Sequence, residues 1–279
     1  MFDAVVFAGG GNRCYWQQGF WEAAAGPLGL APSLVVGASA GAFQAGVSLL
    51  GIGGEVRPLV VEGCRDVRGN IDWRALARGA HAFPVAAAYR ALLLAAYDLA
   101  RLDRLASLTD FRIAIAHPPR WLPTGLAIAL GIGAYQIEKK LTKPVHPRSG
   151  RAMGFVPSFV RLADLPTPEA LADTLMASAG VPPIMPRAMI GGRVAVDGGL
   201  VDNVPVAPVE PIEALGGRSL VLLTRRYPRL PEVPGRTYVQ PSRPIAIGQF
   251  DLTNPEGILA AHALGREDGA AFVAAMRAA

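Results

Sequence analysis

Cysteine is nearly absent from this sequence. Only Cys14 and Cys64 occur among its 279 residues, which is too few for a disulfide framework and lacks the spacing of a zinc or iron site. A chain of this length buries a sizeable core as one α/β domain without cross-links. We therefore expect a single domain over residues 1–279 that uses no metal and no cofactor.

Blocks of like charge are absent too. Charged residues make up 18% of the sequence and are scattered, and 27 basic against 22 acidic residues leave a net charge of +5. The densest basic stretch holds Arg225, Arg226 and Arg229, but no nucleic-acid-binding motif accompanies it, so we expect no nucleic-acid partner. An anionic lipid surface explains the charge more simply, and a solvated loop explains it most simply.

A leader segment is the third absence. No basic region precedes the first apolar run, so the sequence predicts no secretory signal and a cytoplasmic protein. Residues 23–54 carry no charge and match a membrane span by hydropathy alone. Prolines and glycines within them favour a buried strand, turn and helix instead.

The most informative segment lies inside that uncharged stretch. It is Gly37-Ala38-Ser39-Ala40-Gly41, placed between an apolar run and a run of small residues. The pattern indicates a strand, a tight turn and a helix, in which the glycines let the serine hydroxyl stand above the helix N-terminus. Ser39 is therefore the candidate nucleophile. The alternative is a packing turn, because small residues are common throughout this chain.

A glycine loop follows the first apolar run. Residues 2–7 indicate a buried strand and lead into Gly9-Gly10-Gly11-Asn12-Arg13. Consecutive glycines expose backbone N–H groups, which suits either a phosphate or the oxyanion of an acyl-transfer reaction. Cys14 stands where a dinucleotide-binding fingerprint needs glycine, and no P-loop lysine follows, so nucleotide binding is disfavoured.

An aspartate ends a later apolar run. Residues 194–196 precede Asp197-Gly198-Gly199, and an aspartate at a strand end can act as base for a serine on a neighbouring strand. The alternative is a plain Asp-Gly turn. A base near neutral pH needs a raised pKa, which burial beside an apolar pocket supplies, so we expect Asp197 to be half-buried. Asp202 and Asn203 are expected to shape the loop that follows.

A histidine raises a rival arrangement. His262 follows Asp197 and gives the chain order Ser…Asp…His of α/β-hydrolases. In that fold the serine comes after several strands, whereas Ser39 follows what reads as the second strand. His262 also lies in an apolar helical stretch, so we expect it on a helix face. The remaining histidines, expected in surface or packing roles, are His81, His117 and His146.

Four segments, in order, resemble the patatin-like phospholipase family. Residues 9–13 resemble its glycine-rich oxyanion loop, and residues 37–41 its G-x-S-x-G elbow. Residues 177–182, which read Ala-Ser-Ala-Gly-Val-Pro, resemble its helix end before a proline loop, and residues 197–205 its Asp-Gly-Gly block. Ala8 and Cys14 depart from the family's pattern, and Cys14 adds side-chain volume to a tight loop.

The resemblance implies a serine acyl hydrolase of the phospholipase A or lysophospholipase type, acting through a Ser-Asp dyad without histidine or metal. Its substrate would be an acyl ester of a phospholipid, lysophospholipid or neutral lipid. An acyltransferase, a neutral-lipid esterase and a non-catalytic lipid-binding protein are the alternatives. The implied catalytic residues are Ser39 and Asp197, with oxyanion donors at Gly9, Gly10 and Gly11 and supporting residues at Arg13, Gly37, Gly41, Gly198 and Gly199. Arg13 is expected to anchor its loop or, alternatively, to lie near a lipid phosphate.

Strand-like and helix-like runs alternate along the chain. This alternation predicts an α/β fold with a mostly parallel central sheet and helices on both faces, as in the three-layer architecture of that family. The expected strands are residues 3–7, 33–36, 111–116, 194–196 and 219–224, and the expected helices include 74–80, 86–106 and 168–179.

The region from 85 to 150 carries no motif of the family and is expected to vary, as a cap or lipid-docking region. Within it, residues 121–135 are apolar with aromatic ends, and Lys139, Lys140 and Lys143 follow. This pattern suits peripheral docking at a membrane beside the active site, with Leu126 and Ile128 entering the lipid. It suits an ordinary core helix equally well.

Overall fold

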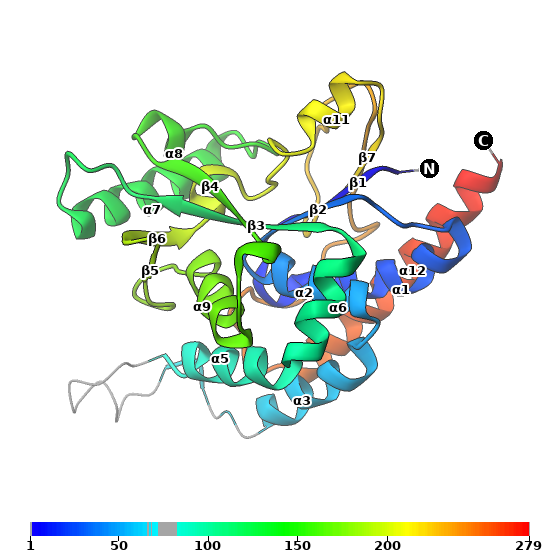
Figure 1. Ribbon diagram of the computed structural model, residues 1–279, viewed down its shortest axis with the longest axis horizontal. Helices are drawn as coiled ribbons and strands as arrows, with labels where there is room; N and C mark the ends of the chain where they lie inside the picture. Colours follow the sequence, from blue (N-terminus) through cyan, green and yellow to red (C-terminus); the bar gives the residue numbers. More distant parts are fainter. Residues whose placement is uncertain (1, 66, 68, 72–82, 279) are drawn as a thin grey trace.

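The computed structural model describes residues 2–65, 67, 69–71 and 83–278 (Figure 1). The helix expected at 74–80 lies outside these residues. Eight strands of the described chain form a sheet in the order β5-β6-β3-β2-β1-β7-β8, with β4 also paired to β3. The expectation of an α/β fold with a mostly parallel sheet is confirmed.

The centre of the sheet is parallel. It consists of β1 (Ala4–Phe7), β2 (Leu34–Ala38), β3 (Asp110–His117), β7 (Ser219–Leu222) and β8 (Arg236–Val239). Strands β1, β2 and β7 are buried along their whole length, which explains why they read as continuous apolar runs.

The other end of the sheet is antiparallel. It holds β4 (Val156–Arg161), β5 (Ala188–Ile190) and β6 (Arg193–Asp197), with β4 and β6 both running against β3. The sequence located β6 but not its direction, because direction depends on the long connection from β3 rather than on local pattern.

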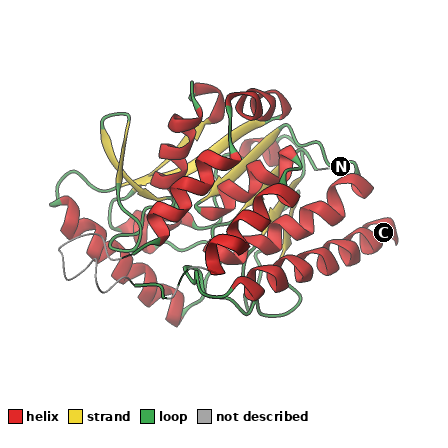
Figure 2. Ribbon diagram, turned by 90° about the horizontal axis from the view of Figure 1, so that it is seen from below, coloured by secondary structure: helices red, strands yellow, loops and turns green. Residues whose placement is uncertain are grey.

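Helices cover both faces of the sheet (Figures 1 and 2). Alternate strand residues, such as Val5 and Phe7, pack on one face against α1 (Tyr15–Leu28), α2 (Ala40–Leu50), α9 (Pro168–Ser178) and α12 (Pro255–Ala278). The opposite face carries α7 (Thr124–Leu141), α8 (Ser149–Ala152), α10 (Gly199–Asp202) and α11 (Glu210–Ala214). The described chain also holds two 3₁₀ turns, η1 (Gly11–Cys14) and η2 (Leu162–Asp164), and helix α3 (Gly53–Arg65).

The long helix expected at 86–106 is two helices. These are α5 (Val85–Ala96) and α6 (Leu99–Leu108), separated by Tyr97 and Asp98 in extended conformation. The Asp98 carboxylate accepts a hydrogen bond of 2.8 Å from the Arg101 N–H, which is the geometry of a helix N-cap. The aspartate therefore starts a new helix where the apolar stripe alone predicts continuation. The helix expected at 168–179 is confirmed as α9.

Helix α7 begins inside the apolar segment at 121–135, at Thr124, and extends beyond it to Leu141. Its inner face buries Ala127, Ile128 and Gly131, while its outer face carries an exposed apolar stripe. Leu126, Leu130, Ile137 and Leu141 are exposed to 49%, 46%, 61% and 78%. The helix is therefore not an ordinary core helix, because only one of its faces is buried. No helix in the described ranges is long and apolar enough to cross a bilayer.

Candidate active site

Ser39 lies on a sharp turn between β2 and α2. Its backbone has φ 53° and ψ −137°, a conformation that is strained for a residue with a side chain. A Cβ atom at Gly37 would overlap the Ala42 backbone, and one at Gly41 would overlap the Ala8 carbonyl. Both glycines are thus needed for the helix to begin so close to the strand ends.

A second serine anchors this turn. The Ser178 hydroxyl, at the end of α9, accepts a hydrogen bond of 2.8 Å from the Ser39 N–H and donates one of 2.6 Å to the Ala114 carbonyl. Ser178 is fully buried. It therefore ties the backbone of the candidate nucleophile to β3. The sequence singled out this segment without giving Ser178 a role.

Strand β3 brings Asp197 level with Ser39. Ala38 pairs with Ala114 on one side of β3, and Asp197 pairs with Ile115 on the other. Ser39 and Asp197 thus come from strands that are not neighbours, because β3 lies between them, whereas the sequence predicted neighbouring strands.

The environment of Asp197 suits a base. Burial raises its pKa to about 7, against the lowering effect of the Gly199 N–H and the Ser39 hydroxyl. The Gly199 N–H donates to Oδ1 at 2.6 Å. Asp197 is 8% exposed, so it is more deeply buried than the half-buried state that the sequence suggested.

The glycine loop is clamped from two sides. Gly9 donates its N–H to the Asn203 carbonyl at 2.9 Å, and its own carbonyl accepts from Asn203 Nδ2 at 2.8 Å and Thr224 Oγ1 at 2.7 Å. The expectation that Gly9 serves as an oxyanion donor is therefore wrong in this structure, because its N–H is occupied. Asn203 shapes this region, as expected. Nothing in the sequence indicated that Thr224, which lies far from the glycine loop along the chain, would hold this loop.

Backbone amides in the described chain remain available around the turn. Gly10 and Gly11 make no hydrogen bond through their N–H groups to the described residues, and neither does Ala40 at the N-terminus of α2. Arg13 anchors the loop as expected, since its Nε donates to the Ile247 carbonyl at 3.1 Å. The Cys14 side chain is accommodated beneath the loop, where it is fully buried and contacts the Ala8 carbonyl.

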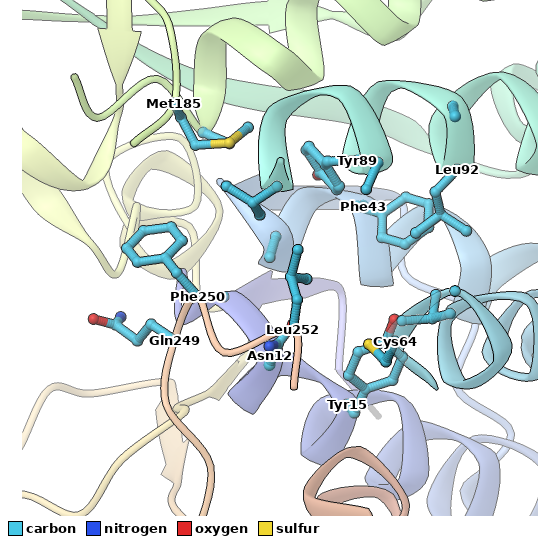
Figure 3. Close-up of a pocket in the computed structure, with 18 of the residues that line it drawn as sticks. Asn12, Tyr15, Phe43, Cys64, Tyr89, Leu92, Met185, Gln249, Phe250 and Leu252 are labelled. Atoms are coloured by element: carbon cyan, nitrogen blue, oxygen red, sulfur yellow. The ribbon is translucent and has the colours of Figure 1, made fainter. Parts of the chain in front are cut away.

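A cavity of about 400 Å³ opens beside Ser39 (Figure 3). Its wall is mostly apolar and comes from α2, α3, α5 and the segment around residue 250. In Figure 3 the side chains of Phe43, Leu92, Met185, Phe250 and Leu252 border a common space. A concave apolar site with few polar groups is the usual form of a small-molecule pocket.

Tyr89 adds a polar atom to this wall. Its ring packs edge-on against Phe43, with centroids 5.8 Å apart, and its hydroxyl is buried without a hydrogen-bond partner in the described chain. Tyr97 packs on the same phenylalanine, but its hydroxyl donates to the Phe43 carbonyl at 3.0 Å. Burial raises the pKa of both tyrosines, so both remain neutral.

The described histidines have partners elsewhere. His262 Nε2 lies 2.8 Å from Glu22 on α1, so it occupies a helix face of α12 as expected. His117 bonds to the Val194 carbonyl, and His146 bonds to Asp202 and Tyr238. His81 lies outside the described residues. The rival Ser…Asp…His arrangement is therefore not assembled by these three histidines.

Metal-ligating side chains do not gather in the described ranges. No group of three or more His, Cys, Asp or Glu residues there is placed to hold an ion. Cys14 and Cys64 are both free and buried.

Fold and site together define an α/β protein with a strained serine elbow, a buried aspartate across one strand and a glycine loop beside them. The chain belongs to the patatin-like phospholipase family, whose sequence model matches residues 5–209. No curated protein sequence matches it. Family membership points to lipid acyl hydrolase activity and a lipid substrate, and the match includes the loop, the elbow and Asp197.

Proposed function

We propose that this protein is a serine acyl hydrolase that cleaves fatty-acyl esters of lipids, in the manner of a phospholipase A or lysophospholipase. The observation that carries the proposal is the pairing of a strained turn at Ser39, which lines a cavity, with a buried Asp197 whose pKa is about 7. Ser39 lines an apolar cavity large enough to take part of an acyl chain.

In this mechanism Asp197 is the general base. It takes the proton of the Ser39 hydroxyl while Oγ attacks the ester carbonyl carbon, and the carbonyl oxygen becomes an oxyanion. The free N–H groups of Gly10 and Gly11 stabilise that oxyanion, with Ala40 at the positive end of α2 as a further donor. The leaving alkoxide then takes the proton from Asp197 and departs, which leaves an acyl-enzyme.

Water completes the cycle. Asp197 takes a proton from a water molecule, whose oxygen attacks the acyl carbonyl, and a second oxyanion forms in the same place. Collapse of this intermediate breaks the bond to Ser39 Oγ, which regains the proton from Asp197. Free fatty acid leaves, and the enzyme returns to its starting state. An acceptor alcohol in place of water would give acyl transfer through the same groups.

We also propose that α7 docks on an anionic lipid surface. Its exposed stripe of Leu126, Leu130, Ile137 and Leu141 lies on one side of the helix, and Lys140 and Lys143 follow at its C-terminal end. An apolar stripe beside cations is typical of helices that lie in a membrane interface. Ile128 has no part in this surface, because it is 4% exposed and packs inward.

Sedimentation with phosphatidylglycerol vesicles tests the docking surface. Replacing both Leu130 and Ile137 by Asp should abolish co-sedimentation, because two charges would enter the apolar stripe. Leu215→Asp is a matched control, since this leucine is 90% exposed on the far end of α11. Equal binding by the double variant and the wild type would overturn the docking proposal.

Ester hydrolysis tests the catalytic proposal. We expect Ser39→Ala and Asp197→Asn each to lower kcat/KM by about 1000-fold or more on a phospholipid and on a p-nitrophenyl ester. Ser48→Ala is the matched control. Ser48 is a buried serine of α2, the helix that follows Ser39, and its hydroxyl has no partner in the described chain. Product analysis separates the alternatives: free fatty acid indicates hydrolysis and a new ester indicates transfer. A folded wild type that cleaves none of these esters would favour the remaining alternative, a non-catalytic lipid-binding protein.

A further inference from the structure

The glycine loop is held at both ends by distant parts of the chain. Before Gly10 it is bound by Asn203 and Thr224. Beyond Gly11 it lies against residues 247–252, an irregular segment that follows β8 and precedes α12. We call this segment the strap. It lies outside the part of the chain that the family model matches, so family membership assigns it no role.

Hydrogen bonds join the strap to the loop. The Asn12 N–H donates to the Gln249 carbonyl at 2.9 Å, and Asn12 Nδ2 donates to the Asp251 carbonyl at 2.6 Å. Arg13 Nε donates to the Ile247 carbonyl at 3.1 Å. All of these acceptors are backbone carbonyls. The position of the loop therefore depends on the course of the strap's backbone.

Gly11 also packs directly on the strap. Its φ is 56°, a conformation that glycine adopts without strain, and a Cβ atom at this position would overlap the Gln249 backbone. Gly10 and Gly11 carry the N–H groups that we propose as oxyanion donors. Because consecutive glycines have a flexible backbone, these donors keep a fixed direction only while both ends of the loop are held.

The strap is at the same time a wall of the apolar cavity. Phe250 and Leu252 line the cavity, as Ser39 does, and Figure 3 shows both side chains at its border. They alternate along the strap with Gln249 and Asp251, whose carbonyls bind the loop. Both side chains are only partly buried, so an acyl chain in the cavity would cover more of their apolar surface.

Other contacts fix the strap from its far side. The Leu252 N–H donates to Asn70 Oδ1 at 2.8 Å, and Asn70 Nδ2 donates to Asp251 Oδ1 at 3.2 Å. Ile247 is buried in an apolar cluster that includes Tyr15. These anchors restrict the strap to small displacements. A ligand that packs on the strap therefore acts on the glycine loop beside it.

We propose that the strap couples acyl-chain binding to the oxyanion loop, so that Phe250 and Leu252 select long chains through the rate of the chemical step. This inference rests on the proposed hydrolase function. A chain packed on these side chains stabilises the strap in the position in which its carbonyls bind Asn12, and this holds Gly10 and Gly11 toward the oxyanion. Binding energy from the remote chain then raises the rate and does not only lower KM.

Matched esters test the coupling. The substrates p-nitrophenyl acetate and p-nitrophenyl octanoate share a leaving group and differ only in chain length. The rate constant of acylation at saturating ester is measured from the p-nitrophenolate released in the first turnover. In the wild type we expect it to be about tenfold or more higher for octanoate than for acetate. In Asn12→Ala and in Phe250→Ala the two rate constants should become nearly equal.

Asn254→Ala is the matched control. Asn254 lies just beyond the strap, and its side chain accepts a hydrogen bond of 2.7 Å from the Gly257 N–H at the start of α12. The control should lose stability but keep the wild-type ratio of rate constants. An unchanged ratio in both test variants would overturn the coupling. So would a chain-length effect that appears only in KM, or an equal loss of the ratio in the control.

Hydrogen exchange separates this proposal from the hydrolase proposal. The Asn12 N–H bonds to the Gln249 carbonyl, so its exchange reports the contact between loop and strap. Octanoate, below its critical micelle concentration, should slow this exchange in the wild type, and acetate should not. Slowing in a wild type that cleaves neither ester would reject the hydrolase and keep the coupling. Cleavage without slowing, whether or not octanoate binds, would keep the hydrolase and reject the coupling.

Discussion

Two regions of the molecule differ in almost every physical respect. In one, α2, α3, α5 and the segment near residue 250 build an apolar cavity beside Ser39. In the other, the positively charged Arg13, Lys139 and Arg225 form no ion pair with the described residues. The following experiments separate the contributions of the two regions.

The largest effect should come from filling the cavity. Ala88 lines it from α5 and is exposed, so Ala88→Phe can place a ring in the acyl space without disturbing the core. We expect kcat/KM for a long-chain ester to fall about 100-fold, because several methylene groups lose their contacts. Acetate esters should lose far less. Ala87→Phe, on the adjacent outward position, is the control, and equal losses for long and short chains would contradict the assignment of the cavity.

The pH profile should show which surroundings set the pKa of Asp197, the proposed general base. Since Asp197 acts deprotonated and its pKa is about 7, kcat/KM should fall about tenfold for each pH unit below 7 and level off above it. Burial causes the shift, so Arg225→Gln should leave the inflection in place. A profile that moves by a full unit in this variant would mean that the cations, not the buried surroundings, set the pKa.

The same shift has a consequence for stability. The pKa of Asp197 is higher in the folded chain than its ordinary value of 3.8, so the folded state binds the proton more tightly. The stabilisation is complete below about pH 4 and is lost as pH rises toward 7. Urea denaturation across this range should show that decline in the wild type and a smaller one in Asp197→Asn.

A change at Ser178, which holds the turn of Ser39, should lower kcat/KM for all ester substrates by the same factor. Ser178→Ala removes the acceptor of the Ser39 N–H and the donor to the Ala114 carbonyl. We expect about a tenfold loss of kcat/KM, because the nucleophile is held less firmly. The factor should be the same for phosphate-bearing and neutral esters, and unequal factors would show that Ser178 acts on one side only.

The smallest effect concerns two tyrosines of the cavity side. Tyr97→Phe should lower the free energy of unfolding by about 1 kcal/mol, because the Phe43 carbonyl loses its buried donor. Tyr89→Phe removes a hydroxyl that has no partner in the described chain, so stability should stay equal or rise. Chemical denaturation of both variants checks this order, and a larger loss for Tyr89→Phe would show that its hydroxyl is satisfied.

Local chemistry explains what the sequence could predict. Ser39 and the glycine loop are recognisable because a sharp turn and free amides require particular residues within a few positions. Asp98, by contrast, carried a cap signal that the apolar stripe of residues 86–106 concealed. A prediction that weighs aspartate as a helix start would have found the break.

Long-range contacts explain what it could not predict. The loss of Gly9 as a donor depends on a hydrogen bond to Asn203, and the loop's second clamp comes from Thr224. Arg225 follows Thr224 directly, so it reaches the glycine loop only because β7 lies beside β1 in the folded sheet. Arg225 read as part of a solvated or lipid-facing loop, since nothing in its neighbours reveals the glycine loop beside it.

Strand β3 makes the proposed catalytic pair a property of sheet register. Ser39 and Asp197 are carried by the two strands that flank β3, one parallel and one antiparallel to it. A shift of β6 by one residue would turn the aspartate to the other face of the sheet. Loss of the proposed activity on heating should therefore coincide with global unfolding and not with an earlier local opening. Enzymatic turnover would then report the fraction of protein that is fully folded.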